Sequence, residues 1–243
     1  MKVLRWVVVG MLGMLSSGAL AEEEAIPVGV GIDLPVLSAY VWRGQVLNDE
    51  AVLQPGLTGT IGGFSVNAWS SMDLTDKQDT SGQFDEMDWT ASYSKTVGMF
   101  ELGAGVVQYT FPNSTITEEA EDGTETVTAY PGTVEVFASV SADVLLSPSL
   151  TVYRDVDEID GFYAVASIGH SFALMDKVGL DLSAALGLGD KDYNTGYFGY
   201  EKAALNDLLL GASLPIAVTE NISVKPSISY MMLPDSDLGD AAE

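Results

Sequence analysis

Carboxylates are the chemically capable side chains that this sequence supplies in the largest number. Asp and Glu total 35 against 10 Lys and Arg, with one His and no Cys. The densest acidic segment is DVDEIDG at 155–161, and oxygen-rich loops of this kind bind calcium. Its spacing is not that of an EF-hand, so we expect a solvated acidic loop in which Asp155, Asp157 and Asp160 are weak metal candidates. Without cysteine, disulfides and thiolate metal sites are excluded.

The single histidine, His170, is the candidate catalytic base if the chain is an enzyme. His170 adjoins Ser171, but neighbouring residues of a strand face opposite ways, so the two cannot act as a nucleophile and its base. No nucleophile elbow, phosphate-binding loop or cofactor motif is present in the sequence. The formal charge of -25 opposes nucleic-acid binding. We therefore expect neither an enzyme nor a cofactor.

Alternation with period two is the main structural signal. In the segments 133–144, 178–190 and 222–232, one set of alternate residues is apolar and the other is small or polar. A soluble sandwich would turn the apolar face inward, whereas a membrane barrel would turn it outward. Alternation alone does not choose between these two folds. Mean hydropathy is +0.21 despite the charge of -25, which favours apolar residues facing lipid and acids lining a lumen and loops.

The connections between these runs are alternately tight and long. The tight ones lie at 62–63, 96–98, 147–149, 175–177 and 219–221, and the longer ones at 74–83, 112–131, 155–160 and 190–203. An up-and-down barrel of the bacterial outer membrane has this arrangement, with short periplasmic turns and long outer loops. Aromatic residues near the predicted outer rim are expected to belong to the interfacial girdle. They are Tyr40, Trp42, Tyr109, Phe111, Tyr153, Phe162 and Tyr163.

The amino terminus predicts export. Residues 1–21 combine a basic start, an apolar core of about ten residues and the small-residue ending Ala19-Leu20-Ala21, which is the pattern of a cleaved signal peptide. An uncleaved membrane anchor would need about twenty apolar residues. Residues 22–243 then form one outer-membrane β-barrel domain.

Eleven strands are predicted, an odd number. They are 29–42, 51–61, 63–73, 84–96, 99–111, 132–145, 149–155, 161–174, 177–189, 204–216 and 221–233. Single-chain bacterial barrels have even strand numbers. We expect an all-β, antiparallel up-and-down transmembrane barrel of twelve strands whose C-terminal strand is missing from this sequence. The alternative is a miscounted hairpin near Leu145.

The segment YVWRGQVLND at 40–49, followed by LQP at 53–55, resembles the opening hairpin of the TorF-like porin family. The early strands of that family carry a Tyr-x-Trp-Arg-Gly pattern followed by an acidic residue. Gly63-Phe64 and Ala68-Trp69 extend the similarity, which covers about residues 38–72; Pro55 stands where the family more often has a small residue. The resemblance implies a signal-bearing bacterial outer-membrane barrel and a pore of unspecified substrate.

Arg43-Gly44 lies at the end of the first predicted strand. This position suits a cation held beneath the first outer loop and paired with Asp49 or with an acid of the lumen. The alternative is a rim arginine that only closes a turn. Arg43, Asp49 and Arg154 are placed at the mouth.

The function predicted from these features is a porin-like diffusion channel for small solutes. Inward-facing candidates are Glu86, Asp88, Glu101, Glu135, Asp143, Asp181, Asp207 and Lys225. Rings of carboxylates favour cations. A twelve-stranded barrel is narrow enough for long loops to fold inward and fill it, so the alternative is a structural or surface-interaction barrel without an open pore. Expected partners are outer-membrane lipid, small solutes or cations, and the barrel-assembly machinery during insertion.

Overall fold

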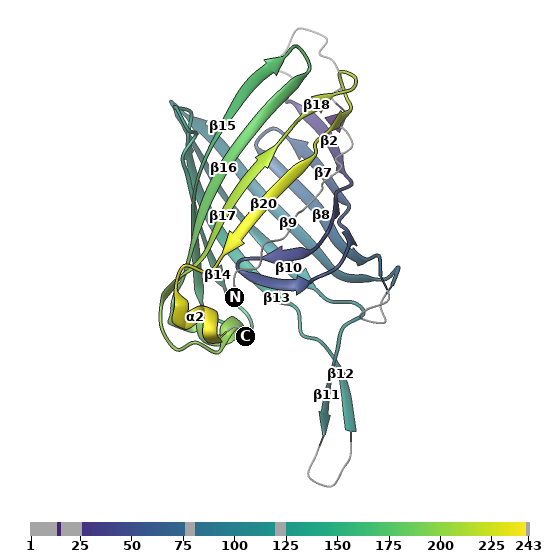
Figure 1. Cartoon of the computed structure of the whole chain (residues 1–243), viewed down its shortest axis with the longest axis vertical. Coiled ribbons are helices and arrows are strands. Elements are labelled where there is room, and N and C mark those ends of the chain that lie inside the picture. Colours follow the sequence, from purple (N-terminus) through teal and green to yellow (C-terminus); the bar gives the residue numbers. More distant parts are fainter. Residues whose placement is uncertain (1–13, 16–25, 76–80, 120–124, 242–243) are drawn as a thin grey trace.

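The protein is described by a computed structural model, which places residues 14–15, 26–75, 81–119 and 125–241 (Figure 1). The predicted signal peptide at 1–21 lies outside the described residues except for Met14–Leu15. The strands are β1 (Met14–Leu15), β2 (Val28–Asp33), β3 (Val36–Leu37), β4 (Tyr40–Trp42), β5 (Gln45–Asn48), β6 (Val52–Leu53), β7 (Gly56–Ile61), β8 (Phe64–Asp73), β9 (Phe84–Val97), β10 (Phe100–Thr110), β11 (Thr115–Glu119), β12 (Glu125–Ala129), β13 (Thr133–Ala142), β14 (Ser149–Asp155), β15 (Phe162–Met175), β16 (Val178–Gly189), β17 (Ala204–Ser213), β18 (Ile216–Ala217), β19 (Ser223–Val224) and β20 (Ser227–Met232). The helices are α1 (Lys191–Phe198) and α2 (Ser236–Ala241). None of the helices in these ranges is long and apolar enough to span a membrane.

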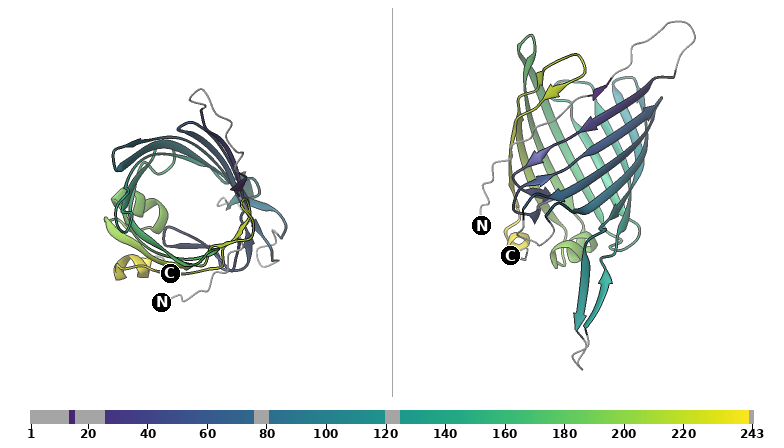
Figure 2. Two further views of the ribbon diagram at one scale, coloured as in Figure 1. Left: turned by 90° about the horizontal axis from the view of Figure 1, so that it is seen from above. Right: turned by 90° about the vertical axis from the view of Figure 1, so that its right-hand side faces the viewer.

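One antiparallel sheet makes the wall of the molecule. Its order is β1-β2-β7-β8-β9-β10-β13-β14-β15-β16-β17-β20, so wall strands that follow one another in the chain are neighbours in space. Seen end-on, the sheet curls into a ring (Figure 2, left). Among the described residues no ladder joins β20 to β2. The all-β class and the antiparallel up-and-down order are confirmed, and the described path from β2 to β20 holds eleven strands.

The two ends of the wall differ as the connection lengths predict. At one edge, β7 turns into β8 through Gly62 and β9 into β10 through Gly98, with φ of 58° and 63°; glycine adopts such positive φ angles without steric cost. The opposite edge, the long-loop end, carries the hairpins β4–β5 and β11–β12 and both helices (Figure 1). The segments predicted as loops at 112–131 and 190–203 thus contain β11–β12 and α1.

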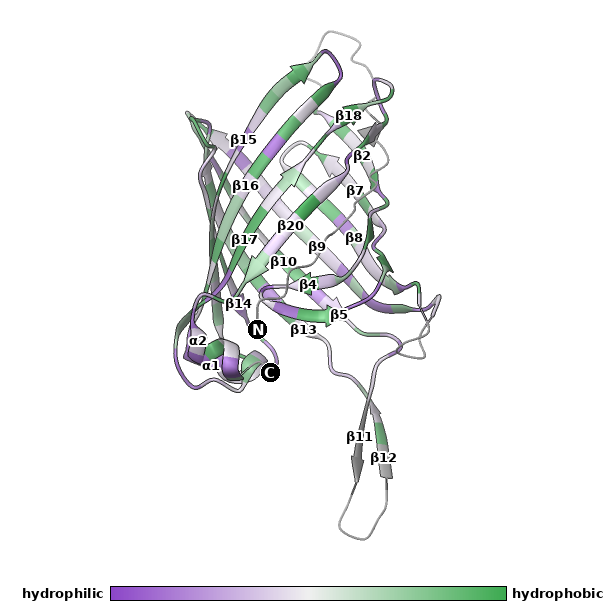
Figure 3. Cartoon of the chain, viewed as in Figure 1, coloured by the Kyte–Doolittle hydropathy of each residue, from purple (hydrophilic) through white to green (hydrophobic). Residues whose placement is uncertain are grey.

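Burial in this sheet is reversed relative to a soluble domain. Leu182, Leu186 and Leu188 on β16 are 42%, 38% and 45% exposed, and apolar residues recur along the outer face of the wall (Figure 3). Glu135 is 1% exposed and Asn206 is 0% exposed on the inner face. Soluble monomers rarely expose contiguous apolar patches of more than a few hundred Å². An exposed apolar face of this extent is typical of a surface that contacts another apolar surface.

The first predicted strand, 29–42, is wrong as a single wall strand. The wall strand β2 ends at Asp33; β3 pairs with β6, and β4 pairs with β5 in a separate two-stranded sheet. Pro35 follows β2 and has no backbone N–H to donate to a neighbouring strand. The strands predicted at 204–216 and 221–233 are likewise divided, with prolines at 215 and 226 between their pieces.

Candidate functional site at the long-loop end

The hairpin β4–β5, residues 40–48, is called the mouth hairpin because it lies within the ring of wall strands at the long-loop end (Figure 2, left, and Figure 3). Trp42 pairs with Gln45, so Arg43 and Gly44 are the two central residues of its turn. Their φ angles are 43° and 91°, as a type I′ hairpin turn requires. For arginine this conformation costs about 1–2 kcal/mol, so the contacts of Arg43 must compensate for it.

Arg43 makes a two-pronged ion pair with an acid on the inner face of the sheet. Its Nη1 and Nη2 donate hydrogen bonds of 2.6 and 2.7 Å to the two carboxylate oxygens of Glu135 on β13. Tyr109 on β10 donates a third hydrogen bond of 2.8 Å to Glu135 Oε2. The side chains of Arg43 and Glu135 are 10% and 1% exposed. The sequence left the partner of Arg43 open, and the structure identifies it as Glu135 on the inner face of the sheet, 92 residues away.

Aromatic rings surround the guanidinium of Arg43. Its Cζ lies 4.6 Å from the ring centre of Trp42, 4.3 Å from Tyr153, 4.4 Å from Tyr163 and 5.9 Å from Tyr193. Cation–π contacts of this length stabilise by about 0.5–2 kcal/mol each, with the larger values in desolvated sites. Together with Glu135 they fix the tip of the mouth hairpin to strands β13, β14 and β15 and to α1.

The electrostatic environment keeps Arg43 charged and Tyr193 neutral. Burial alone would lower the pKa of Arg43, but the hydrogen bonds to Glu135 and the surrounding negative charge outweigh it, so its pKa lies well above the usual value. Burial raises the pKa of Tyr193, although the positive charge of Arg43 acts in the opposite direction. The site is therefore a fixed charge pair in a neutral aromatic setting.

Helix α1 is positioned by buried amides at the end of the wall. The side chain of Asp190 accepts a hydrogen bond of 2.8 Å from the backbone N–H of Tyr193 and caps the first turn. Asn206 on β17 accepts from Gly189 N at 2.7 Å and donates to Asn194 Oδ1 at 2.6 Å. This network places the rings of α1 against Arg43.

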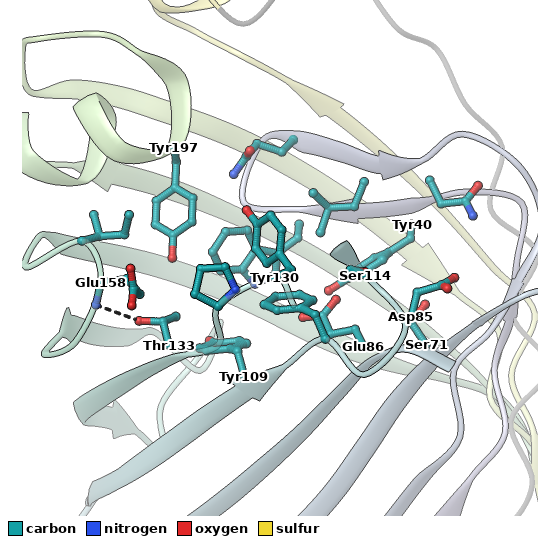
Figure 4. Close-up of a pocket in the computed structure, with 17 residues that line it drawn as sticks. Tyr40, Ser71, Asp85, Glu86, Tyr109, Ser114, Tyr130, Thr133, Glu158 and Tyr197 are labelled. Carbon is teal, nitrogen blue, oxygen red and sulfur yellow. Dashed lines mark hydrogen bonds between the residues drawn. The ribbon is translucent and has the colours of Figure 1, made fainter. Parts of the chain in front are cut away.

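The opposite side of the mouth hairpin borders a cavity of about 530 Å³ (Figure 4). Tyr40 and Tyr109 line this cavity, and Tyr197 enters it from α1 (Figure 4). Trp42 of the hairpin also lines it and packs edge-on against Tyr109. Asp85, Glu86 and Glu158 supply its acidic groups. Burial, and next the charge of Glu86 and a hydrogen bond to it, raise the pKa of Tyr40.

Four of the acids predicted to face inward are gathered at this end: Glu86, Asp88, Glu135 and Asp207. Glu135, Glu86 and Asp207 are 1%, 5% and 6% exposed. Asp207 accepts a hydrogen bond of 2.7 Å from Tyr163. Asp88 lies opposite Tyr109 across the β9–β10 ladder. Glu135 is engaged by Arg43 and cannot act as an open carboxylate of a pore ring.

The other predicted lumen charges lie farther toward the tight-turn end. Asp181 accepts a hydrogen bond of 2.7 Å from Ser171, and Lys225 Nζ lies 3.7 Å from its Oδ2. Glu101 is the second residue of β10, and Asp143 directly follows the last residue of β13. Both fall on the inward-facing set of their strands, so the structure separates the predicted acids into a mouth group and a tight-turn group.

The acidic loop at 155–161 is organised by its own backbone and by Arg154. Asp155 accepts hydrogen bonds from the backbone N–H groups of Asp157 and Ile159 at 3.0 and 3.1 Å. Asp160 pairs with Arg154. Within the described ranges no group of three or more His, Cys, Asp or Glu is arranged to hold a metal ion. The weak candidates Asp155, Asp157 and Asp160 do not form such a group.

Most of the predicted girdle aromatics face inward, which corrects their assignment. Tyr40, Tyr109 and Tyr163 are 9%, 8% and 3% exposed, and Trp42 and Tyr153 contact Arg43. Strand parity contained the signal, because Tyr109 shares the inward set of β10. Tyr193 and Tyr197 were missed, although an acidic cap at 190 and a glycine at 199 bracket their helix in the sequence.

These observations define an all-β protein built on one antiparallel up-and-down sheet whose long-loop end holds an arginine-centred aromatic site. The chain belongs to the Gcw_chp family, described as bacterial proteins of unknown function, whose sequence model matches residues 21–225. Comparison with curated proteins and with solved structures gave no match.

Proposed function

We propose that this protein is a β-barrel of the bacterial outer membrane that conducts small solutes, with a mouth narrowed by the mouth hairpin. The observation that carries the proposal is the reversed burial of the wall. Leu186 on the outer face is 38% exposed, whereas Glu135 on the inner face is 1% exposed. Lipid accepts an apolar outer face, and a water-filled lumen accepts a polar inner one. The signal-peptide pattern and the resemblance of residues 38–72 to TorF-like porins support the same location.

Charges toward the tight-turn end support a preference for cations. Glu101, Asp143 and Asp181 face inward there, with Lys225 beside Asp181. Three carboxylates against one ammonium leave this part of the lumen negative, which attracts cations and repels anions. The Arg43–Glu135 pair adds no net charge at the mouth.

The direct test is ion conduction by the purified, folded protein in planar lipid bilayers. We expect discrete single-channel steps and a reversal potential in a salt gradient that indicates cation preference. The heat-denatured protein serves as the control for detergent and contaminant currents. Absence of steps from protein that has inserted into the bilayer would contradict the channel.

A second function, a closed barrel that presents its loops at the cell surface, is favoured by one observation. The mouth hairpin is held across the long-loop end by Arg43 on one side and Tyr40 on the other. Replacing residues 41–47 by a short Gly-Ser link separates the two functions. In a narrowed channel, this change raises the conductance severalfold from a measurable starting value. In a closed barrel, conduction appears only after the replacement.

A further inference from the structure

The cavity between the mouth hairpin and the wall has a lining of unusual chemistry. Six of its residues are aromatic and three are acidic, and none of its 17 lining residues is Lys, Arg or His (Figure 4). The aromatic residues are Tyr40, Trp42, Tyr109, Phe111, Tyr130 and Tyr197. Its volume of about 530 Å³ falls within the usual range of small-molecule sites.

The aromatic walls approach from separate elements and present both faces and edges. Trp42 contacts Tyr109 and Tyr197 edge-on, with ring centres 6.0 and 5.2 Å apart. Phe111 and Tyr130 form a second edge-on pair at 5.1 Å. The rings therefore line two sides of one space. An aromatic enclosure of this kind binds the ammonium groups of organic cations through the negative faces of the rings.

The acidic residues make the electrostatic potential in this cavity negative. Glu86, 5% exposed, lies at the inner side beside Tyr40, and Glu158 lies at the exposed side. Asp85 joins them on the wall. An anionic ligand would meet the like charge of Glu158 and Asp85. A cation is attracted by both the aromatic rings and the carboxylates.

We propose that this cavity is a binding site for a small organic cation that carries a substituted ammonium group. The site includes side chains of the mouth hairpin, so a bound cation stabilises the docked hairpin by mass action. The inference goes beyond the proposed channel and does not depend on it, because binding is measured without any current.

The test uses the folded full chain in detergent, choline as the probe and 3,3-dimethylbutan-1-ol as its neutral isostere. Isothermal titration calorimetry should detect choline binding, with the isostere at least about tenfold weaker. Glu158→Gln combined with Asp85→Asn should weaken choline binding by about tenfold, and Tyr130→Leu should weaken it as well. Glu201→Gln, an exposed acid of another long loop, is the matched control and should leave the affinity unchanged.

The possible results test the cation site and the proposed channel separately. Equal affinity for choline and its isostere would overturn the cation site and indicate a neutral ligand. No choline binding by a protein that conducts would overturn the site and leave the channel standing. Choline binding by a protein without single-channel steps would support the site and contradict the channel.

Discussion

Removing the guanidinium of Arg43 should release the mouth hairpin. Arg43→Ala leaves Glu135, 1% exposed, as a buried carboxylate whose remaining hydrogen bond comes from Tyr109. Breaking a buried ion pair from one side costs about 3–5 kcal/mol, because the other charge is left uncompensated. The loss of contacts to three rings within 4.6 Å adds to this cost. We therefore expect docking of the hairpin to weaken by at least about 3 kcal/mol.

The absence of native cysteine allows a clean measurement of hairpin release. Ala39, beside the mouth hairpin, is 2% exposed, so a thiol at Ala39→Cys reacts with a maleimide only when the hairpin moves away. Since about 1.4 kcal/mol corresponds to a factor of ten, 3 kcal/mol raises the open fraction by about a hundredfold. The labelling rate of Ala39→Cys should therefore rise by at least about tenfold in the Arg43→Ala background. Ser81→Cys, at an exposed loop position, should label rapidly in both backgrounds.

Arg154 provides the matched arginine control. Its side chain is 34% exposed and its partner Asp160 is 76% exposed, and exposed ion pairs contribute about 0–1 kcal/mol. Arg154→Ala should change the labelling rate at Ala39→Cys by less than about fivefold. Glu135→Gln should raise the rate, and its combination with Arg43→Ala should raise it by less than the product of the two single effects. A labelling rate that Arg43→Ala leaves unchanged would refute the anchoring role of Arg43.

Three further predictions concern charge, facing and turns. Asp181→Asn should lower the cation/anion permeability ratio and Lys225→Gln should raise it, both less at high salt because screening shortens the range of these charges; unchanged ratios would place them outside the conduction path. Leu186→Arg should cost about 2–4 kcal/mol and impair insertion, whereas Ser183→Arg on the inward face should still insert; equal behaviour in a vesicle-folding assay would disprove the facing. Gly98→Ala should lower the free energy of unfolding in urea by about 1 kcal/mol, because φ there is 63° and nothing lies within 4 Å of the added methyl group; no change would show that the turn relaxes.

The wall could be predicted from the sequence because its signal is local and repeated. In β16, alternation alone separated Leu182, Leu186 and Leu188 from Gly187 and Gly189, and the structure exposes the first set and buries the second. Connection lengths then fixed which strands are neighbours. The same parity placed Glu135, Asp181 and Asp207 on the inner face.

The mouth could not be predicted in this way because its contacts join distant segments. Tyr40, Val41 and Trp42 alternate as any wall strand does, and period two does not indicate whether the partner is the wall or a hairpin. Arg43 pairs with Glu135 across 92 residues, a distance over which sequence spacing carries no geometric information. Long loops were expected to fold inward, but residues 40–48, which form the mouth hairpin, were not among the predicted long loops.

Lipid contact of the outer face is the central physical claim, and tryptophan quenching tests it most directly. Trp89 is 49% exposed on the outer face, whereas Trp69 packs on Tyr40 at 5.6 Å and Trp42 packs on Arg43. Single-tryptophan variants, with each other tryptophan including Trp6 replaced by Phe, are folded into vesicles of brominated lipid. The Trp89 protein should lose most of its fluorescence, while the Trp42 and Trp69 proteins should keep most of theirs. Quenching of Trp42 or Trp69 equal to that of Trp89 would contradict the account.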